Sequence, residues 1–247
     1  MAEQPGLEKL FFELASESRL GIMRELQKEN LKMQEIARRL NVTPTEAFRQ
    51  LERLGVATLV QRQPDGTFAL AEYGKIVLQI STSLDFLFKH KEYFSTHDLM
   101  RLPSQFVNRL GELAGAKLEL DTIESLNKGA KWFAEAKQYA WGIGEGTIPE
   151  HMIPVMNQQV QRGIQVKMLI SGEVLPAVNQ PGTPRNVEAR GLSDLPGIVA
   201  VTEKMAGICF RQVGGRIDYA GFFGSASVFH NWVKDLFMYY WEKAKRA

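Results

Sequence analysis

The 247-residue sequence contains a single cysteine, Cys209, and only four histidines, which lie far apart in the chain. One cysteine excludes an intramolecular disulfide and any zinc site that uses several cysteine ligands. Because Cys209 lies in the apolar run of residues 207–210, we interpret it as a buried small residue rather than a reactive thiol. The scattered histidines predict no metal site.

Long hydrophobic runs are also missing. No stretch approaches the roughly 20 apolar residues that a membrane-spanning helix needs. The first six residues, MAEQPG, lack the basic and then apolar order of a secretory signal. These two absences favour a cytoplasmic location. The chain nevertheless has 45% hydrophobic residues, enough to form the cores of two domains.

The most informative segment is residues 31–70, whose pattern is typical of a winged helix-turn-helix. Met33, Ile36, Ala37 and Leu40 recur at the spacing of one helix face. After the break at residues 41–42, a second helix is predicted to begin. Three of its first residues favour a helix start: Thr43 as the N-cap, Pro44 at the first helical position and Glu46 as the partner in a capping box.

The second helix is predicted to have an inner and an outer face. Ala47, Leu51 and Leu54 form the inner stripe. Residues 57–60 and 67–70 are expected to be strands around the turn at residues 63–66, whose Pro-Asp-Gly order favours a hairpin. This hairpin is the predicted wing. The outer face of the helix carries Thr45, Phe48, Arg49, Gln50 and Arg53.

A helix placed in this way presents its early residues to the base edges of the major groove. The candidates for reading bases are Thr43, Thr45, Phe48 and Arg49. The candidates for phosphate contacts are Arg38, Arg39, Arg53 and Arg62, and Gln50 fits either group. From Arg38 to Arg62 there are five arginines and no lysine against two glutamates, a net charge of +3, whereas the whole chain carries only +2. The basicity is therefore local, which favours double-stranded DNA as a partner.

Helices are also expected on both sides of this segment. Residues 7–14 and 19–26 have helical spacing, with Ser16 or Ser18 as the cap between them, and are expected to pack under the DNA-reading helices. Residues 72–91 predict a longer amphipathic helix. Its apolar side either forms a homodimer, which would suit palindromic half-sites, or packs on its own chain. That side carries Ile76, Val77, Ile80, Leu84, Leu87 and Phe88.

From about residue 96 strands alternate with helices, which predicts an α/β domain over residues 96–247 after a DNA-binding domain over residues 1–95. The expected strands are residues 116–120, 138–143, 163–170, 186–189, 198–202, 206–211 and 216–223. The expected helices are residues 121–136, 149–161 and 225–245, with a loop at residues 176–184 and a turn at Gly214 and Gly215.

Three segments carry a resemblance to a known family. They are residues 96–103 (THDLMRLP), 162–170 (RGIQVKMLI) and 232–240 (WVKDLFMYY). With the winged-helix segment, they resemble archaeal methanogenesis-regulator-type transcription factors, which join a winged helix like that of the arsenic repressors to a sensor domain. The resemblance covers nearly the whole chain and implies a cytoplasmic, homodimeric regulator whose second domain binds an effector. Metal-sensing arsenic-repressor relatives have paired cysteines in the winged helix, which this sequence lacks.

The alternating pattern of the second domain also resembles phospholipase-D-like folds. That chemistry needs a histidine two residues before a lysine, and none of His90, His97, His151 and His230 has lysine at that spacing. No Gly-x-Ser-x-Gly elbow is present, and the glycine run at residues 142–146 matches neither phosphate-binding pattern. The sequence therefore predicts no catalytic residues and no cofactor.

The same glycine run marks the predicted effector site, because ligands of open α/β sheets bind beyond the carboxyl ends of strands. Trp141, Glu145 and His151 are the expected lining residues, and Lys204 or Arg211 would offer a charge to an anionic effector. The sequence thus favours a sequence-specific transcription regulator controlled by a small molecule. The alternative is a degenerate phospholipase-D-like enzyme, or a protein that uses the winged helix for docking.

Overall fold

A computed structural model of the chain describes residues 6–144, 152–172 and 187–246. It divides into two compact units, Met1–Thr82 and Ser83–Ala247. The division lies inside one helix, α5 (Glu72–Lys89), rather than near residue 95 as the sequence predicted. The reason is packing, because Phe86 and Tyr93 are buried in the core of the second unit whereas Val77 is buried in the core of the first. No helix of the described residues is long and apolar enough to cross a membrane.

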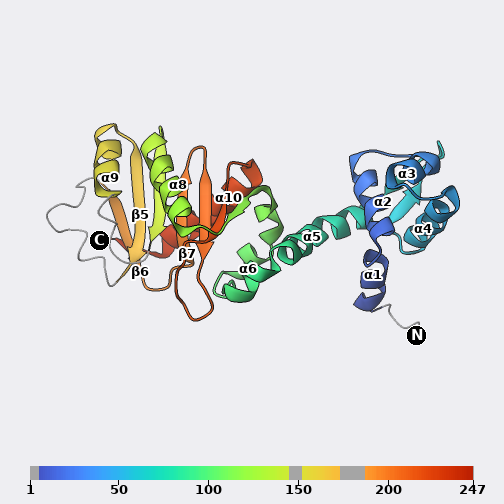
Figure 1. Ribbon diagram of the computed structural model, residues 1–247, viewed down its shortest axis with the longest axis horizontal. Coiled ribbons are helices and arrows are strands. Elements are labelled where there is room, and N and C mark those ends of the chain that lie inside the picture. Colours follow the sequence, from blue (N-terminus) through green and yellow to red (C-terminus); the bar gives the residue numbers. More distant parts are fainter. Residues whose placement is uncertain (1–5, 145–151, 173–186, 247) are drawn as a thin grey trace. The chain divides into compact units, whose positions relative to one another are not determined.

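The first unit is a winged helix-turn-helix (Figure 1). Its apolar core joins the inner faces of three helices to the wing and to the start of α5, and includes Ile22, Ile36, Leu54 and Leu70. The elements before α5 are α1 (Leu7–Leu14), α2 (Glu17–Lys28), α3 (Met33–Leu40), α4 (Pro44–Val56), β1 (Val60–Arg62) and β2 (Phe68–Leu70).

Most local signals of the first unit are confirmed. Ser16 caps α2, since its hydroxyl accepts a hydrogen bond from Arg19 N. β1 and β2 pair antiparallel, and Leu31 forms a further bridge with Phe68. The first wing strand begins at Val60 and not at residue 57. The helix α1 differs from expectation, because it has no buried residue and leaves Leu7 and Phe12 more than half exposed.

The second unit is an α/β layer structure built on a mixed sheet. Within the described residues the sheet has eight strands in the order β10-β6-β5-β4-β7-β8-β9-β3, of which β4, β5 and β6 run parallel to one another. The strands are β3 (Lys117–Glu119), β4 (Tyr139–Gly144), β5 (Gln165–Ser171), β6 (Glu188–Leu192), β7 (Gly197–Thr202), β8 (Ala206–Phe210), β9 (Gly221–Gly224) and β10 (Lys245–Arg246). The helices are α6 (Lys91–Thr96), α7 (Ser104–Val107), the 3-10 helix η1 (Leu110–Gly115), α8 (Thr122–Glu135), α9 (Met152–Gln161) and α10 (Ser227–Lys243).

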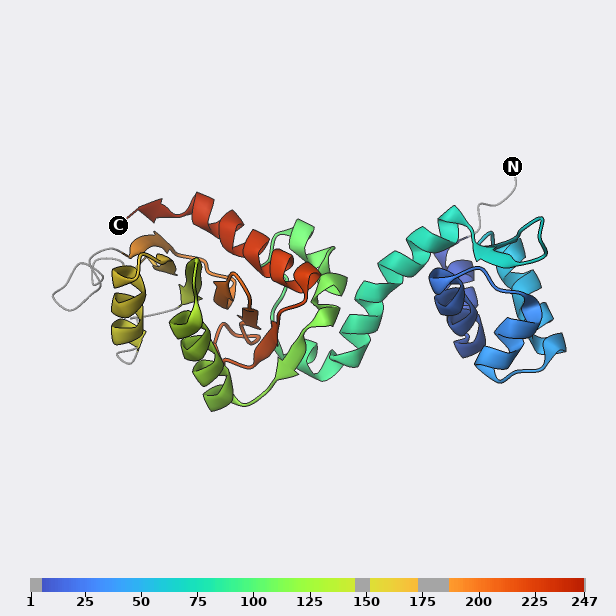
Figure 2. The same cartoon turned by 90° about the horizontal axis from the view of Figure 1, so that it is seen from above.

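Helices cover both faces of this sheet. Figure 2 shows α10 along one face, with α8 and α9 on the other. The last helix has an apolar stripe at helical spacing, which includes Phe229, Phe237 and Trp241, and in α10 this stripe is buried against the sheet. The terminal helix therefore uses its stripe to cover its own sheet, which makes it a poor choice for a dimer contact.

The strand expected at residues 216–223 is shorter than the pattern predicted. Gly214 and Gly215 have φ of 97° and 91° in a turn, as expected, but β9 begins only at Gly221. Asp218 explains the delay, because its carboxylate accepts hydrogen bonds from Gln212 Nε2 and Ala220 N. Tyr219 has a φ of 63°, which no strand residue adopts. The loop expected at residues 176–184 lies outside the described residues.

Candidate nucleic-acid interface

The N-terminus of α4 is fixed by the cap that the sequence predicted. Thr43 Oγ1 accepts a hydrogen bond from Glu46 N at 3.2 Å, and Pro44 occupies the first helical turn. The reciprocal half of the predicted capping box is not made. The Glu46 carboxylate instead accepts from Gln50 Nε2 at 3.1 Å and Arg49 Nη2 at 3.5 Å. The N-terminus of α4 is thus fixed by its cap, and the Glu46 carboxylate lies beside Arg49 and Gln50.

The two faces of α4 differ as the pattern predicted. Ala47 and Leu54 have no exposed surface, and Leu51 is also buried. On the other side Thr45 is exposed, Phe48 is 49% exposed and the Arg49 side chain is 68% exposed. An apolar ring, a hydroxyl and a guanidinium group therefore project together from the first two turns, which is the composition that base-edge and thymine-methyl contacts require.

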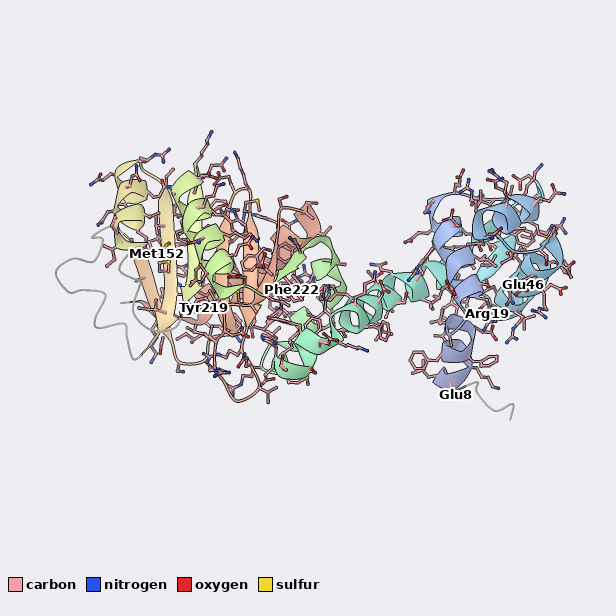
Figure 3. All side chains as sticks on the ribbon, viewed as in Figure 1. Glu8, Arg19, Glu46, Met152, Tyr219 and Phe222 are labelled. Carbon is pink, nitrogen blue, oxygen red and sulfur yellow. The ribbon has the colours of Figure 1, made fainter. Side chains whose placement is uncertain are left out.

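Gln50 is the exception on this helix, since it is buried rather than exposed. Its Oε1 accepts from Arg19 Nη1 at 3.0 Å and its Nε2 donates to Glu46. Arg19 lies on α2 and Glu46 on α4 (Figure 3). Gln50 therefore joins two helices and is not available to DNA, and the assignment of Gln50 as a DNA contact is corrected.

The arginines of α3 are engaged by carboxylates of the same unit. Arg39 contacts three of them: Nη1 to Glu25 at 3.1 Å, Nη2 to Glu29 at 2.8 Å and Nε to Glu35 at 3.0 Å. Arg38 also pairs with Glu35, at 2.6 Å, but its side chain remains 76% exposed. The two guanidinium groups lower the pKa of Glu35 to about 2, chiefly through hydrogen bonds. Arg38 is therefore the better placed of the two for a phosphate.

Arg53 is held in a similar way. Its Nη2 lies 2.7 Å from Glu13 Oε1, and its guanidinium carbon lies 5.0 Å from the centre of the Phe12 ring. These contacts tie the last turns of α4 to the end of α1 and raise the pKa of Arg53 through the hydrogen bond to Glu13. The predicted phosphate contact at Arg53 would have to compete with this carboxylate.

The wing presents Arg62 without such competition. Arg62 ends β1, is exposed, and forms no ion pair within the described residues. The turn beyond it is closed by Asp65 Oδ1, which accepts from Thr67 N at 2.9 Å and Thr67 Oγ1 at 2.6 Å, and by Gly66 with a φ of 84°. These hydrogen bonds lower the pKa of Asp65, and Lys32 adds a weaker electrostatic effect.

The sequence did not predict two features of this surface. Lys32 is exposed at the N-cap of α3 and interacts electrostatically with Asp65 in the wing turn. It adds a cation outside residues 38–62, the range for which the net charge of +3 was given. The carboxylates that pair with Arg38, Arg39 and Arg53 also lie outside residues 38–62. The spacing of Glu35 to Arg38 and Arg39, three and four residues, is a visible signal of helix ion pairs. The partners from α2 are not visible, because only the tertiary fold brings Glu25 to Arg39.

The three predicted effector residues that the structure describes, Trp141, Lys204 and Arg211, do not form one site. Trp141 is buried under α10, where its ring stacks on Phe237 at 5.2 Å, and Lys167 and Lys234 lie 5.0 and 5.5 Å from its ring centre. Its Nε1 has no hydrogen-bond partner within the described residues. Side chains alternate along a strand, so Trp141 lies on the face opposite α8 and α9. The interpretation of Trp141 as a lining residue at the strand end is therefore corrected.

Lys204 and Arg211 are separated by the whole length of β8. Lys204 lies in the turn before β8, and Arg211 follows it at the other end. A strand rises about 3.3 Å per residue, so the two cations cannot share a small ligand. Arg211 Nε and Nη1 also donate to Leu195 O and Gly215 O, both at 2.9 Å, and burial lowers the pKa of Arg211. The two remaining candidates, Glu145 and His151, lie outside the described residues.

A cavity of about 460 Å³ is lined in part by His97 and Asp218. His97 is 6% exposed, and its ring stacks on Tyr93 at 3.6 Å. Its Nδ1 lies 2.7 Å from Tyr93 O, and its Nε2 lies 3.3 Å from Asp218 Oδ2. Since both ring nitrogens face oxygens of the protein, this imidazole has a structural role in joining α6 to the loop before β9.

The described structure thus defines the chain as a two-unit protein, with a winged helix-turn-helix followed by an α/β unit.

No protein family and no curated protein matches the chain. Among solved structures it is similar to TrmBL2, an archaeal chromatin protein, with 15% identity, 88% of each chain covered and a TM-score of 0.45. It is also similar to NucT from Helicobacter pylori and to Nuc, a phospholipase D family member from Salmonella typhimurium. NucT has 13% identity and a TM-score of 0.40, and Nuc has 10% identity and a TM-score of 0.37. Each of these two matches covers 53% of this chain and 98% of the other. All three TM-scores are below 0.5.

Proposed function

We propose that this chain is a sequence-specific, DNA-binding transcription regulator of the cytoplasm, in which α4 reads the major groove and the wing contacts the backbone. One observation carries the proposal. The capped first turns of α4 expose Thr45, Phe48 and Arg49 on one side, while the opposite side is sealed into the core. A helix whose base-reading groups are free and whose inner face is fixed is the arrangement that helix-turn-helix recognition uses.

The contacts of the arginines on this surface support different roles for them. Arg49 is mostly exposed and makes only a 3.5 Å contact with Glu46, so it can turn toward a guanine edge. Arg62 on the wing and Arg38 on α3 are exposed cations and suit phosphates. Arg39 and Arg53 contribute mainly to the stability of the unit, because their guanidinium groups already have carboxylate partners.

The proposal includes a homodimer formed through α5. Ile76 is 57% exposed and Ile80 65%, and Leu84 continues the same stripe at 53%. Val77 and Leu87, which the sequence placed on the same side, instead pack on the cores of their own units. The sequence left two uses of this helix open, and the exposed residues favour the dimer. Paired reading helices would match the two halves of a palindromic site.

The proposal also includes control by a small-molecule effector bound in the second unit and assigns no catalytic step. An effector changes DNA affinity only if it binds one arrangement of the protein more tightly than another.

The test is fluorescence anisotropy with the full chain, the DNA upstream of its own gene and a scrambled duplex of equal length, over a salt series. We expect a preference of about 10³ or more for the native duplex and an affinity that falls with salt.

Arg49→Ala should relax the preference at a cost of about 1–3 kcal/mol, whereas Arg62→Ala should weaken binding to both duplexes alike and flatten the salt slope. Lys131→Ala, which removes an exposed cation of α8, is the matched control. Equal, weak binding of both duplexes by the wild type, repeated on genomic fragments, would contradict the proposal and favour the docking alternative.

A further inference from the structure

The face of the sheet opposite α10 contains a cavity of about 140 Å³ between the strands and the helices α8 and α9. We refer to it as the α8–α9 cavity. Ser125 and Phe133 line it from α8, Met156 from α9, and Gly142 and Met168 from β4 and β5. Figure 3 labels two further lining residues, Met152 and Tyr219.

Glycines leave this space open. Gly129 lies between Ser125 and Phe133 on one face of α8, since residues four apart share a face. Within the part of the chain that the structure describes, no atom beyond the helix backbone and the neighbouring residues lies within 4 Å of the point where its Cβ would be, and the same holds at Gly144 at the end of β4. Glycine inside a helix weakens it relative to alanine. The chain therefore has a residue that destabilises the helix at a position where a large side chain would occupy the cavity.

The cavity contains an unused hydrogen-bonding group. Ser125 is 5% exposed, and its Oγ has no hydrogen-bond partner within the described residues. Buried hydroxyl groups nearly always have a partner, so an unpaired one facing a cavity indicates a place for a polar ligand atom. The Cys209 thiol differs, because its Sγ donates to Tyr219 O at 3.0 Å.

The other walls determine the class of ligand. Three methionines (Met152, Met156 and Met168) and two phenylalanines (Phe133 and Phe223) contribute flexible and aromatic apolar surface. None of the described lining residues is charged. An apolar cavity of roughly 150 Å³ accepts benzene. The space therefore fits one small ring, and a charged group there would lack a counterion.

We propose that the α8–α9 cavity binds a small neutral ring compound that carries one hydroxyl group, with this hydroxyl hydrogen-bonded to Ser125 Oγ. The site differs from the anionic effector site that the sequence predicted, both in its residues and in the charge of its ligand. The assignment of the cavity as the effector site of the regulator rests on the proposed function. The binding of the ring compound in the cavity does not.

The experiment is isothermal titration calorimetry of the full chain with p-cresol, and with toluene, which has the same ring and methyl group but no hydroxyl. We expect p-cresol to bind at one site per chain and toluene to bind more weakly. Ser125→Ala should lower the affinity for p-cresol about 3- to 10-fold, the effect of one neutral hydrogen bond, and leave toluene unchanged. Gly129→Leu should abolish binding of both, whereas Gly129→Ala, the matched control, should retain it.

Absence of p-cresol binding, or unchanged binding by Gly129→Leu, would overturn the site. Unchanged p-cresol affinity in Ser125→Ala would overturn the role given to the hydroxyl. A second measurement separates this inference from the proposed function, namely DNA anisotropy with and without p-cresol. If the chain binds its duplex and the cavity binds p-cresol but the two affinities are independent, the cavity is not the effector site. If p-cresol binds and no duplex does, the DNA-binding proposal fails and the cavity assignment remains.

Discussion

Arg19 on α2 donates a hydrogen bond from Nη1 to Gln50 Oε1 on α4 at 3.0 Å. Arg19 is 7% exposed and also donates from Nη2 to Phe12 O at 2.7 Å and from Nε to Glu13 O at 2.8 Å. One guanidinium group thus joins the end of α1, the start of α2 and the middle of α4. The orientation of α4 depends on this contact as well as on apolar packing.

Replacing Gln50 by leucine should destabilise the first unit. The substitution leaves Arg19 Nη1 without its acceptor, and an unsatisfied buried donor costs about 1–3 kcal/mol. Urea denaturation of the full chain, followed by circular dichroism, measures the free energy of unfolding. Glu52→Leu, which changes an exposed residue of the same helix, is the control and should stay within about 0.5 kcal/mol of the wild type. A Gln50→Leu variant as stable as this control would show that the contact contributes nothing.

Replacing Glu35 by glutamine should strengthen DNA binding without changing sequence preference. The Glu35 carboxylate pairs with both Arg38 and Arg39 and so competes with phosphate for their guanidinium groups. We expect the affinity for any duplex to rise roughly 3- to 10-fold at low salt, with a smaller gain at high salt. Glu72→Gln, in an exposed pair with Lys75 on α5, is the control. A loss of affinity in Glu35→Gln would show that the carboxylate positions the arginines rather than competing for them.

The same carboxylate predicts a dependence of stability on pH. The pKa of Glu35 falls from 4.5 to about 2 because Arg38 and Arg39 donate hydrogen bonds to it. A lowered folded-state pKa means that the stabilisation is fully present above the unfolded value and is lost as the pH falls through the folded value. The difference in stability between wild type and Glu35→Gln should therefore be constant above about pH 5 and shrink between about pH 4.5 and pH 2. Urea denaturation over this range measures it, and a difference that does not change with pH would contradict the assignment.

Cys209 should be unreactive in the folded protein. It is 3% exposed and burial raises the pKa of its thiol, so little thiolate is present at neutral pH and a bulky reagent cannot reach it. We expect reaction with Ellman's reagent only at the rate of unfolding, and complete reaction in denaturant. Asn127→Cys adds an exposed thiol on α8 and should react at once. Equally rapid reaction of the native thiol would contradict the burial.

A charge in the exposed stripe of α5 should separate the proposed dimer. Ile80→Glu places a carboxylate at a 65% exposed position whose apolar surface the dimer would bury. Burying an unpaired charge is costly, so light scattering should find a monomer where the wild type is a dimer. Gln79→Glu adds the same charge one residue away from the stripe and should leave the dimer intact. A monomeric wild type would remove the dimer from the proposal.

Local signals predicted most of the fold. The α4 cap at Thr43 and the Pro-Asp-Gly turn of the wing were visible because each depends on residues within four positions. The apolar stripe at helical spacing gave the inner face of α4. The candidate DNA surface follows from the same local patterns, since a helix with one buried face must present the other.

The sequence by itself determined the two classes of unit, the position of the helix-turn-helix and the exposure of Phe48 and Arg49, because these depend on short-range geometry and on the period of apolar residues. Only the tertiary structure decided which polar groups meet. It buried Gln50 against Arg19, gave Arg39 the carboxylates of α2, and placed Trp141 on the opposite face of the sheet from the cavity beside Gly129 and Ser125. These partners lie far apart in the chain, and their contacts depend on how helices and strands pack. No spacing rule contains that information.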